Sequence, residues 1–424
     1  MAPPIENKMR ALLDRRKSLS SFRTLTTFPP SSIDFSSNDF LSLSTSPLLR
    51  SAYLQELHNY PNFRLGSTGS RLLDGNSTYA EDLEKEIANF HNAESALLFN
   101  SGFDANSGFF ACAPQPGDII IYDEFVHASA REGIKLSRCS KNLPFRHNSV
   151  EDLKRVILEL KRDDREVRDG KRSVLIAVES LYSMDGDLAP LEEIVNLVER
   201  ELGRNGLLVV DEAHSTGIYG DHGRGVVCAL GLEKRIFARL HTCGKALACN
   251  GAAILGSSLV REYLINYARP LIYTTAMSFP SLAAIKVVYS LMREGRTEAL
   301  RFRLNELIEY MYTQLKTLEP YTEDLTTSTS LLQIPPEMPS SPIFSILMPD
   351  PRSLARHCQA ADFVVRPIMP PTVPEGTQRV RVCLHAGNTH EDIERLVAAI
   401  KDWSLLQRRG VKERGGEEFV KAVL

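Results

Sequence analysis

The chain has 424 residues, 43% of them hydrophobic, which is enough for two domains with sizeable cores and an N-terminal arm. Its 50 Lys and Arg residues nearly balance its 53 Asp and Glu residues, for a formal net charge of -3, which argues against nucleic acid or a membrane surface as the main partner. No apolar run reaches the roughly 18 residues of a membrane span.

The composition also bears on the compartment. The seven cysteines are scattered and form no Cys-x-x-Cys pair, so neither a disulfide framework nor a zinc site is indicated. The first 30 residues are basic and Ser-rich like a mitochondrial presequence, but Glu6 and Asp14 interrupt them. The terminal Ala422-Val423-Leu424 lacks the basic middle residue of an SKL-type peroxisomal signal. We expect a cytoplasmic protein, with the mitochondrial and peroxisomal locations left open.

The middle of the chain alternates helical and strand-like patterns. Ser149 is a typical N-cap, followed by a helix with one apolar face. A buried strand is predicted at Ser173–Val178, then a helix that Pro190 opens, and then a second buried strand at Leu207–Val210. Arg239–Thr242 is a weaker third strand. Continuous apolar strands separated by helices predict a mainly parallel sheet that is covered on both faces.

The character of the sequence changes near residue 285. A long helical stretch at Pro280–Leu318 precedes short predicted strands at Ile343–Leu347 and Arg379–Cys383 and a helix at Glu391–Ile400. The predicted organisation therefore has three parts: an N-terminal arm over residues 1–50, a large α/β domain over 51–285, and a small α+β domain over 286–424.

Polar clusters follow the three predicted strands, where sheets of this kind bind ligands. They are Glu179 to Ser183, Asp211-Glu212-Ala213-His214, and Thr242-Cys243-Gly244-Lys245. A carboxylate, a histidine and a lysine at neighbouring strand ends suit a cofactor that needs an imine partner and a counter-ion. Asp-Glu-Ala-His is also a helicase signature, but no Gly-Lys pair here continues into the Ser or Thr of an ATPase phosphate loop, which excludes that class.

Between about Ser36 and Ile400 the chain resembles the α-oxoamine synthases, a family of fold-type I pyridoxal-phosphate enzymes. The matching stretches occur in family order: FSSNDFLSLS, GSTGSRLLDGN, LFNSGFDAN, DEFVHAS, VESLYSMDGDLAPL, VVDEAHSTGIYG, HTCGKAL and PPTVPEGTQRVRV. The resemblance implies a pyridoxal 5'-phosphate enzyme with a large, mainly parallel-sheet α/β domain and a smaller α+β C-terminal domain. It also implies that the enzyme joins a small amino acid to an acyl-CoA with loss of CO2.

The resemblance assigns roles around the cofactor ring. Lys245 would hold the cofactor as a Schiff base and move protons, and Asp211 would keep the pyridine nitrogen protonated. His214 would bond the phenolic oxygen, and His127 would stack on the ring. Without the resemblance, Lys245 would be read as a surface lysine, Asp211 as a helix cap, and each histidine as a satisfied, partly buried residue.

Other positions would hold the phosphate and line the pocket. Ser101-Gly102-Phe103 precedes an apparent helix, whose free N–H groups favour anions, and Thr242 would add a hydroxyl. Thr275, in IYTTAMS, would reach the phosphate of a neighbouring subunit, which implies a homodimer with composite sites. Glu179 and Ser183 would line the pocket near the reacting carbon and the cofactor oxygen.

The substrate residues follow from the same resemblance. Arg381 and Asn38 would bind the amino-acid carboxylate, with a structural salt bridge as the alternative reading of Arg381. Ser70 leaves room for the methyl group of alanine. Arg16 or Arg23, in or near an arginine-bearing first helix, could meet a distal carboxylate on the acyl chain. The sequence departs from the family pattern at Ala246-Leu247-Ala248-Cys249 and at Ala80, and these departures could alter substrate fit.

These features favour condensation of alanine with pimeloyl-CoA, as in biotin synthesis. A secondary-metabolism or lipid-type synthase that uses another acyl-CoA is the close alternative. A non-catalytic subunit of a heterodimer is the alternative of another class, but such subunits typically lack the lysine, and Lys245, Asp211 and His214 are all present.

Overall fold

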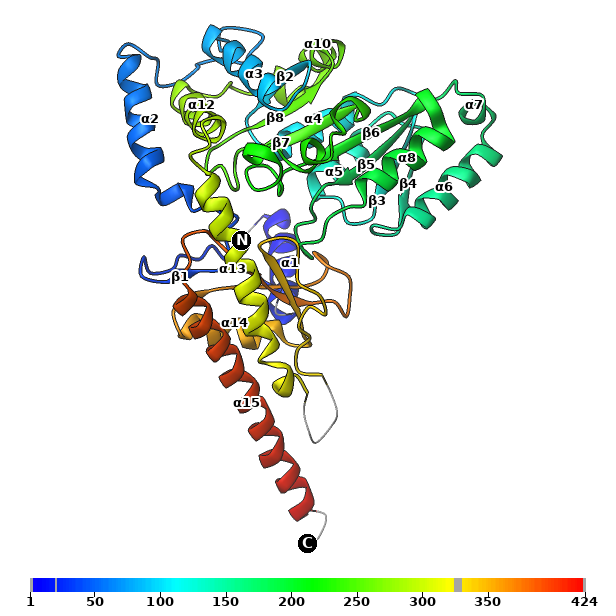
Figure 1. Cartoon of the computed structure of the whole chain (residues 1–424). Helices are drawn as coiled ribbons and strands as arrows, with labels where there is room; N and C mark the ends of the chain where they lie inside the picture. The colour runs from blue at the N-terminus through cyan, green and yellow to red at the C-terminus, as the bar shows by residue number, and fades with distance from the viewer. Residues whose placement is uncertain (1–2, 20, 324–329, 422–424) are drawn as a thin grey trace.

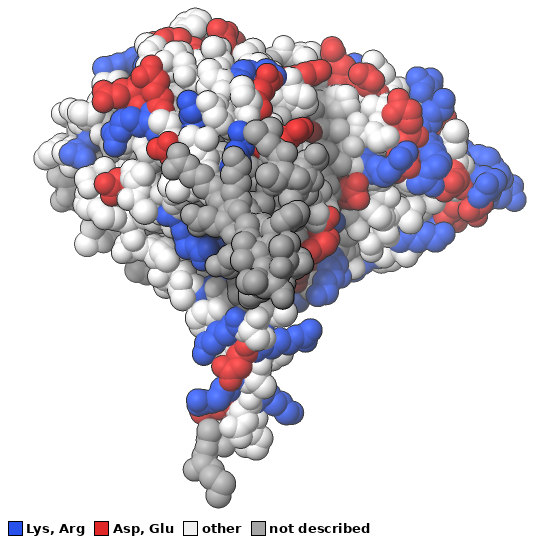
Figure 2. All heavy atoms as spheres, turned by 90° about the horizontal axis from the view of Figure 1, so that it is seen from below, with Lys and Arg blue, Asp and Glu red and all other residues white. Residues whose placement is uncertain are grey.

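The computed structural model of the chain describes residues 3–19, 21–323 and 330–421, and from residue 409 onward it describes the backbone alone. A seven-stranded sheet and its helices occupy the upper part of Figure 1, and a smaller part with a three-stranded sheet lies below it. Acidic and basic side chains are intermixed on the face shown in Figure 2.

The large sheet has the strand order β2-β8-β7-β6-β5-β3-β4. Its strands are β2 (Ser95–Phe99), β3 (Ile119–Asp123), β4 (Lys141–Phe145), β5 (Val174–Glu179), β6 (Gly206–Asp211), β7 (Ala238–Thr242) and β8 (Ala252–Gly256). β8 runs antiparallel to both of its neighbours, and the five strands from β7 to β4 are parallel. The predicted mainly parallel sheet is therefore confirmed.

Helices cover both faces of this sheet, because successive strand residues point to opposite sides. On one face, Ile176 and Val210 pack in a core with Leu153 and Ile194 from α6 (Val150–Asp163) and α8 (Leu191–Leu202). On the other, Ala177 packs in a core with residues of α4 (Gly102–Cys112) and α5 (Ala128–Leu136). Ser149 caps α6 as predicted, since its hydroxyl accepts a hydrogen bond from the Asp152 N–H at 3.1 Å.

The remaining elements around the large sheet are shorter or peripheral. The helices are α2 (Pro47–Asn59), α3 (Thr78–Phe90), α7 (Arg165–Arg168), α9 (Val226–Ala229), α10 (Ser258–Tyr267) and α11 (Arg269–Ile272). Single 3-10 turns occur at Leu43–Thr45, Gly203–Asn205, Asp221–Gly223, Glu233–Arg235 and, farther along, Glu319–Tyr321.

The smaller part contains an antiparallel sheet of order β11-β12-β9. Its strands and helices are β9 (Ile343–Leu347), β11 (Arg366–Ile368), β12 (Arg379–Cys383), α14 (Pro351–Ala360) and α15 (His390–Lys421). Two long helices, α12 (Phe279–Arg293) and α13 (Glu298–Lys316), replace the single predicted stretch, because a turn at Gly295, with φ +72°, separates them.

The N-terminal segment belongs to neither sheet. β1 (Ile33–Asp34) pairs in parallel with β10 (Phe363–Val364), which ties this segment to the smaller part. α1 (Pro4–Ser18) precedes it and has no buried side chain. The domain limits predicted at residues 50 and 285 stay a prediction.

Three further observations concern the described residues. All seven cysteines are described, and each is a free thiol. No cluster of potential metal ligands occurs in the described ranges. None of the helices described there combines the length and apolarity that a bilayer crossing requires.

Candidate active site

A cavity of about 840 Å³ opens at the carboxyl ends of β3, β5, β6 and β7, where the two parts of the molecule meet. Ligands bind at this edge in sheets of this kind. Six residues predicted from the sequence line the cavity: Asn38, His127, Ser183, His214, Lys245 and Arg381.

Lys245 lies in the turn after β7, and its half-buried side chain lines the cavity. Burial lowers the pKa of Lys245 to about 8, although the carboxylates of Asp211 and Glu179 act in the opposite direction. A substantial fraction of the amine is therefore neutral near physiological pH, and only the neutral amine can form an imine with an aldehyde.

Asp211 and Glu179 end the adjacent strands β6 and β5 and are directly paired in register. Asp211 accepts hydrogen bonds from Asn106 Nδ2 at 2.7 Å and from the Ala213 N–H at 2.9 Å. Burial, followed by the Asp211 charge, raises the pKa of Glu179 well above its ordinary value. Asp211 is thus fixed as a hydrogen-bond acceptor, whereas the neutral form of Glu179 is favoured.

Two imidazoles face the same cavity. His127 caps the start of α5, and its Nδ1 lies 2.7 Å from Ser129 Oγ. His214 is 4% exposed, and its Nδ1 has no hydrogen-bond partner among the described residues. Burial lowers the pKa of both histidines; at His127 the Asp211 carboxylate opposes this effect, and the Lys245 charge adds to it at both rings. Both rings are therefore neutral, and the free Nδ1 of His214 can bond a ligand oxygen or nitrogen.

Arg381 comes from β12 of the smaller sheet and is 7% exposed. It donates from Nη2 to Asn38 Oδ1 at 2.9 Å and from Nε to the Ser183 carbonyl at 2.6 Å. Within the described part of the chain these partners are an amide and a carbonyl rather than a carboxylate. The salt-bridge alternative is therefore not what the structure contains, and a buried guanidinium beside a cavity fits an anionic ligand.

The predicted phosphate residues lie at the ends of β2 and β7, and Thr242 precedes the turn that carries Lys245, although none of them is in the cavity lining. Ser101 caps α4, its hydroxyl accepting from the Asp104 N–H at 3.0 Å. A Cβ added to Gly102 would lie 3.3 Å from Thr242 Oγ1, so the start of α4 packs closely against the end of β7. Phe103 is 50% exposed. The start of α4 and the Thr242 hydroxyl together offer the helix N-terminus and the hydroxyl donor that an anion requires.

Three further predicted residues lie neither in the cavity lining nor at the strand ends that border it. Ser70 and Thr275 pair with each other in an isolated antiparallel bridge, and Asn100 Nδ2 donates to the Thr275 carbonyl at 2.8 Å. Arg23 is exposed. None of the three is among the residues that line the cavity.

Sequence reasoning missed residues that shape the site. Asn106 holds Asp211, and its only signal was its place in the stretch LFNSGFDAN. Phe125 and Tyr182 form cavity walls, and Asp185 lines the cavity while it pairs with Arg379 of β12. An ion pair between residues this far apart in sequence leaves no local pattern from which it could be found.

The donor set fits pyridoxal phosphate. An amine with a lowered pKa, a flat neutral imidazole and a fixed carboxylate match an aldehyde, an aromatic ring and a protonated ring nitrogen. The capped helix start beside Thr242 matches a phosphate.

Comparisons with known proteins agree with this geometry. Residues 30–400 match the family model for aminotransferase class I and II. The 8-amino-7-oxononanoate synthase of Emericella nidulans is 51% identical over 406 residues, which cover 95% of this chain and 96% of that enzyme. The aminoacyl transferase sphA of Aspergillus fumigatus is 40% identical over 416 residues, covering 95% of this chain and 88% of that protein.

A solved structure supports the fold over nearly the whole length. The serine palmitoyltransferase of Sphingomonas wittichii superposes with a TM-score of 0.81 at 25% identity, and the match covers 96% of this chain and 99% of that one. Another solved structure with the same TM-score holds pyridoxal phosphate as an internal aldimine.

Proposed function

We propose, because the chain belongs to the pyridoxal-phosphate-dependent α-oxoamine synthases within the aminotransferase class I and II family, that it condenses alanine with pimeloyl-CoA and releases CoA and CO2. This is the 8-amino-7-oxononanoate synthase reaction of biotin synthesis. The observation that carries the choice of substrates is the 51% identity, over 95% of this chain, to an enzyme of that name.

The cavity residues supply what such a condensation needs from the protein. The cofactor, when bound, acts as an electron sink for a carbanion beside the amino group. Lys245 would hold the cofactor and then take the α-proton of the amino acid, because its lowered pKa makes it an effective base near neutral pH. Asp211, fixed by Asn106, would keep a proton on the ring nitrogen.

The amino acid would be oriented from the opposite side of the cavity. Arg381 and Asn38 would bind its carboxylate, with Arg381 held in place by the Ser183 carbonyl. His127 would stack on the cofactor ring, and the free Nδ1 of His214 would meet its phenolic oxygen. Together these contacts would hold the reacting carbon of the amino acid near Lys245.

We also propose a homodimer in which Thr275, Ser70 and Arg23 serve the partner's cavity. The support is that Ser70 and Thr275 pair with each other away from the lining of their own cavity, and that Arg23 is exposed. Mixing a Lys245→Ala homodimer with a Thr275→Ala homodimer, each impaired alone, should restore activity after subunit exchange, because some hybrid dimers contain one intact site. An active monomer in light scattering, or mixed dimers that stay inactive, would contradict this proposal.

The second candidate is a synthase that uses another acyl-CoA, and the 40% identity to an aminoacyl transferase sphA favours it. Purified holoprotein assayed for CoA release should prefer pimeloyl-CoA with alanine over glycine or serine. A plain fatty acyl-CoA of similar length that exceeds pimeloyl-CoA in kcat/KM would overturn the first proposal and support the second. A protein that binds cofactor but turns over no member of the panel would point to the non-catalytic subunit.

A further inference from the structure

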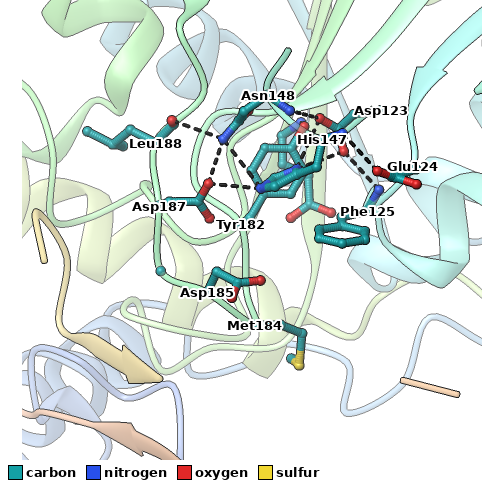
Figure 3. Close-up of polar contacts among 12 residues, drawn as sticks. Asp123, Glu124, Phe125, His147, Asn148, Tyr182, Met184, Asp185, Asp187 and Leu188 are labelled. Carbon is teal, nitrogen blue, oxygen red and sulfur yellow. Dashed lines mark hydrogen bonds and ion pairs between the residues drawn. The ribbon is translucent and has the colours of Figure 1, made fainter. Parts of the chain in front are cut away.

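A half-buried histidine outside the cavity lining bridges two of the turns that form the cavity walls. His147 follows the edge strand β4, and Figure 3 shows its ring between Asp123 and Asp187. His147 Nδ1 lies 3.0 and 3.1 Å from the two Asp123 oxygens, and Nε2 lies 2.9 Å from Asp187 Oδ2. Because each ring nitrogen faces a carboxylate, both must donate, and the ring is an imidazolium.

The first turn that His147 contacts carries His127. Asp123 is completely buried at the end of β3, and its Oδ1 also accepts from the Phe125 N–H at 2.8 Å. The Phe125 ring stacks on the His147 ring, with centroids 4.5 Å apart and planes at 29°. Phe125 and His127 both line the cavity. His147 therefore contacts this turn in two ways, through the Asp123 carboxylate and through the Phe125 ring.

The second turn, Tyr182–Asp187, contains Ser183, which holds Arg381 through a hydrogen bond. Asp187 closes a turn in which its carbonyl accepts from the Tyr182 N–H at 3.0 Å, and the Tyr182 ring meets the edge of His147 at 4.4 Å. Ser183, in the same turn, accepts from Arg381. Asn148 strengthens this side because its Nδ2 donates to Asp187 Oδ2 at 2.6 Å, from a backbone with φ +52° that asparagine tolerates.

We propose that His147 is a positioning residue for the reaction. It fixes the turn Asp123–His127 against the turn Tyr182–Asp187, and so sets the gap between His127 and Arg381 in which the amino acid binds. The proposal rests on the proposed function only in taking the ligand of this gap to be an amino acid. Charge-assisted hydrogen bonds at both nitrogens suit this task, because they are stronger and shorter than neutral ones.

Asp187 allows a selective test, since its side chain is 39% exposed while Asp123 is buried. Asp187→Ala removes one bridge and leaves the Asp123–His147 pair in place. Asp187→Asn keeps an acceptor without the charge, and His147→Gln removes the imidazolium. Glu306→Ala is the matched control, because Glu306 pairs with His390 at 3.1 Å between α13 and α15, away from the cavity lining.

The holoproteins would be titrated with alanine, and binding read from the absorbance of the bound cofactor, which requires no acyl donor. Asp187→Ala and His147→Gln should each raise the half-saturating alanine concentration about tenfold, with Asp187→Asn in between and the control unchanged. The double variant should be no worse than the worse single one, because both remove the same bridge. All titrations would be run well below the melting temperature of each variant, because Asp187→Ala also loses the stability that the bridge to His147 contributes.

Single variants within twofold of wild type, or effects that multiply in the double variant, would overturn the proposal. If His147→Gln does not fold, Asp187→Ala and Asp187→Asn decide the matter alone. Failure of the proposed function has a different signature, because alanine would then bind with the expected differences among variants while no acyl-CoA is consumed.

Discussion

Replacing Asn106 by alanine tests how firmly Asp211 must be held. Asn106 is 4% exposed, and its Nδ2 donates to Asp211 Oδ2 at 2.7 Å and to Ser129 Oγ at 3.0 Å. A hydrogen bond to a charged group contributes roughly 1.5–3 kcal/mol, so the loss corresponds to about a ten- to hundredfold change in an equilibrium that depends on it. We expect the dissociation constant of pyridoxal phosphate to rise by about that factor, since Asp211 would lose its orientation toward the ring nitrogen.

The assay is a titration of apoprotein with pyridoxal phosphate, followed by the yellow absorbance of the imine. Asn205→Ala is the matched control, because Asn205 is also buried and donates two hydrogen bonds, at 3.2 and 2.8 Å, to the carbonyls of Val167 and Arg172. Both variants should melt at a lower temperature, but Asn106→Ala alone should bind cofactor more weakly. Equal cofactor affinities in the two variants would refute the reasoning.

Three further predictions concern single residues. The rate at which apoprotein forms the imine with the cofactor should increase with pH and level off above about 8, because burial lowers the pKa of Lys245 to that value. Lys245→Ala should form no imine, and a rate that still increases toward pH 10 would contradict this prediction. Arg23→Ala should raise KM for pimeloyl-CoA severalfold without changing alanine binding, and equal kinetics with both substrates would remove Arg23 from the site. Burial opposes the His147 cation, but Asp123 and Asp187 outweigh it and raise the pKa of His147 to about 10, against about 6.5 in an unfolded chain. The stability lost in His147→Gln, measured by melting, should therefore be largest below about pH 6.5 and should vanish as pH rises through about 10; a pH-independent difference would show that the charge is not responsible.

The centre of the large sheet could be predicted from the sequence because its strands are buried on both faces. Ser173–Val178 and Leu207–Val210 lie within a residue or two of β5 and β6, since an uninterrupted apolar run has one simple explanation between two helices. The prediction of one helical stretch over Pro280–Leu318 was wrong in one respect. The apolar pattern continues across the turn at Gly295, and a period of 3.6 residues does not reveal so short an interruption.

The cavity was predictable where its residues directly follow such strands. Asp211, His214 and Lys245 do so, and the structure gathers them near one cavity. His147 was not predictable, because it follows β4, a largely exposed edge strand with Pro144 inside it, and such a segment has neither an apolar run nor clean alternation. The reach of Thr275 into a partner's site stays a prediction, as do the substrate roles of Ser70 and Arg23, since one chain does not show how two chains meet.

Two arginines of β12 reach the same turn of the large part. Residues two apart on a strand share a face, so Arg379 meets Asp185 and Met184 while Arg381 meets Ser183. Chimeras among relatives are constrained by this arrangement. A recombinant that takes everything after residue 286 from another member would import a new β12 against the old turn, so the segment around Ser183–Asp185 has to be exchanged together with β12, although about 195 positions separate them in the chain.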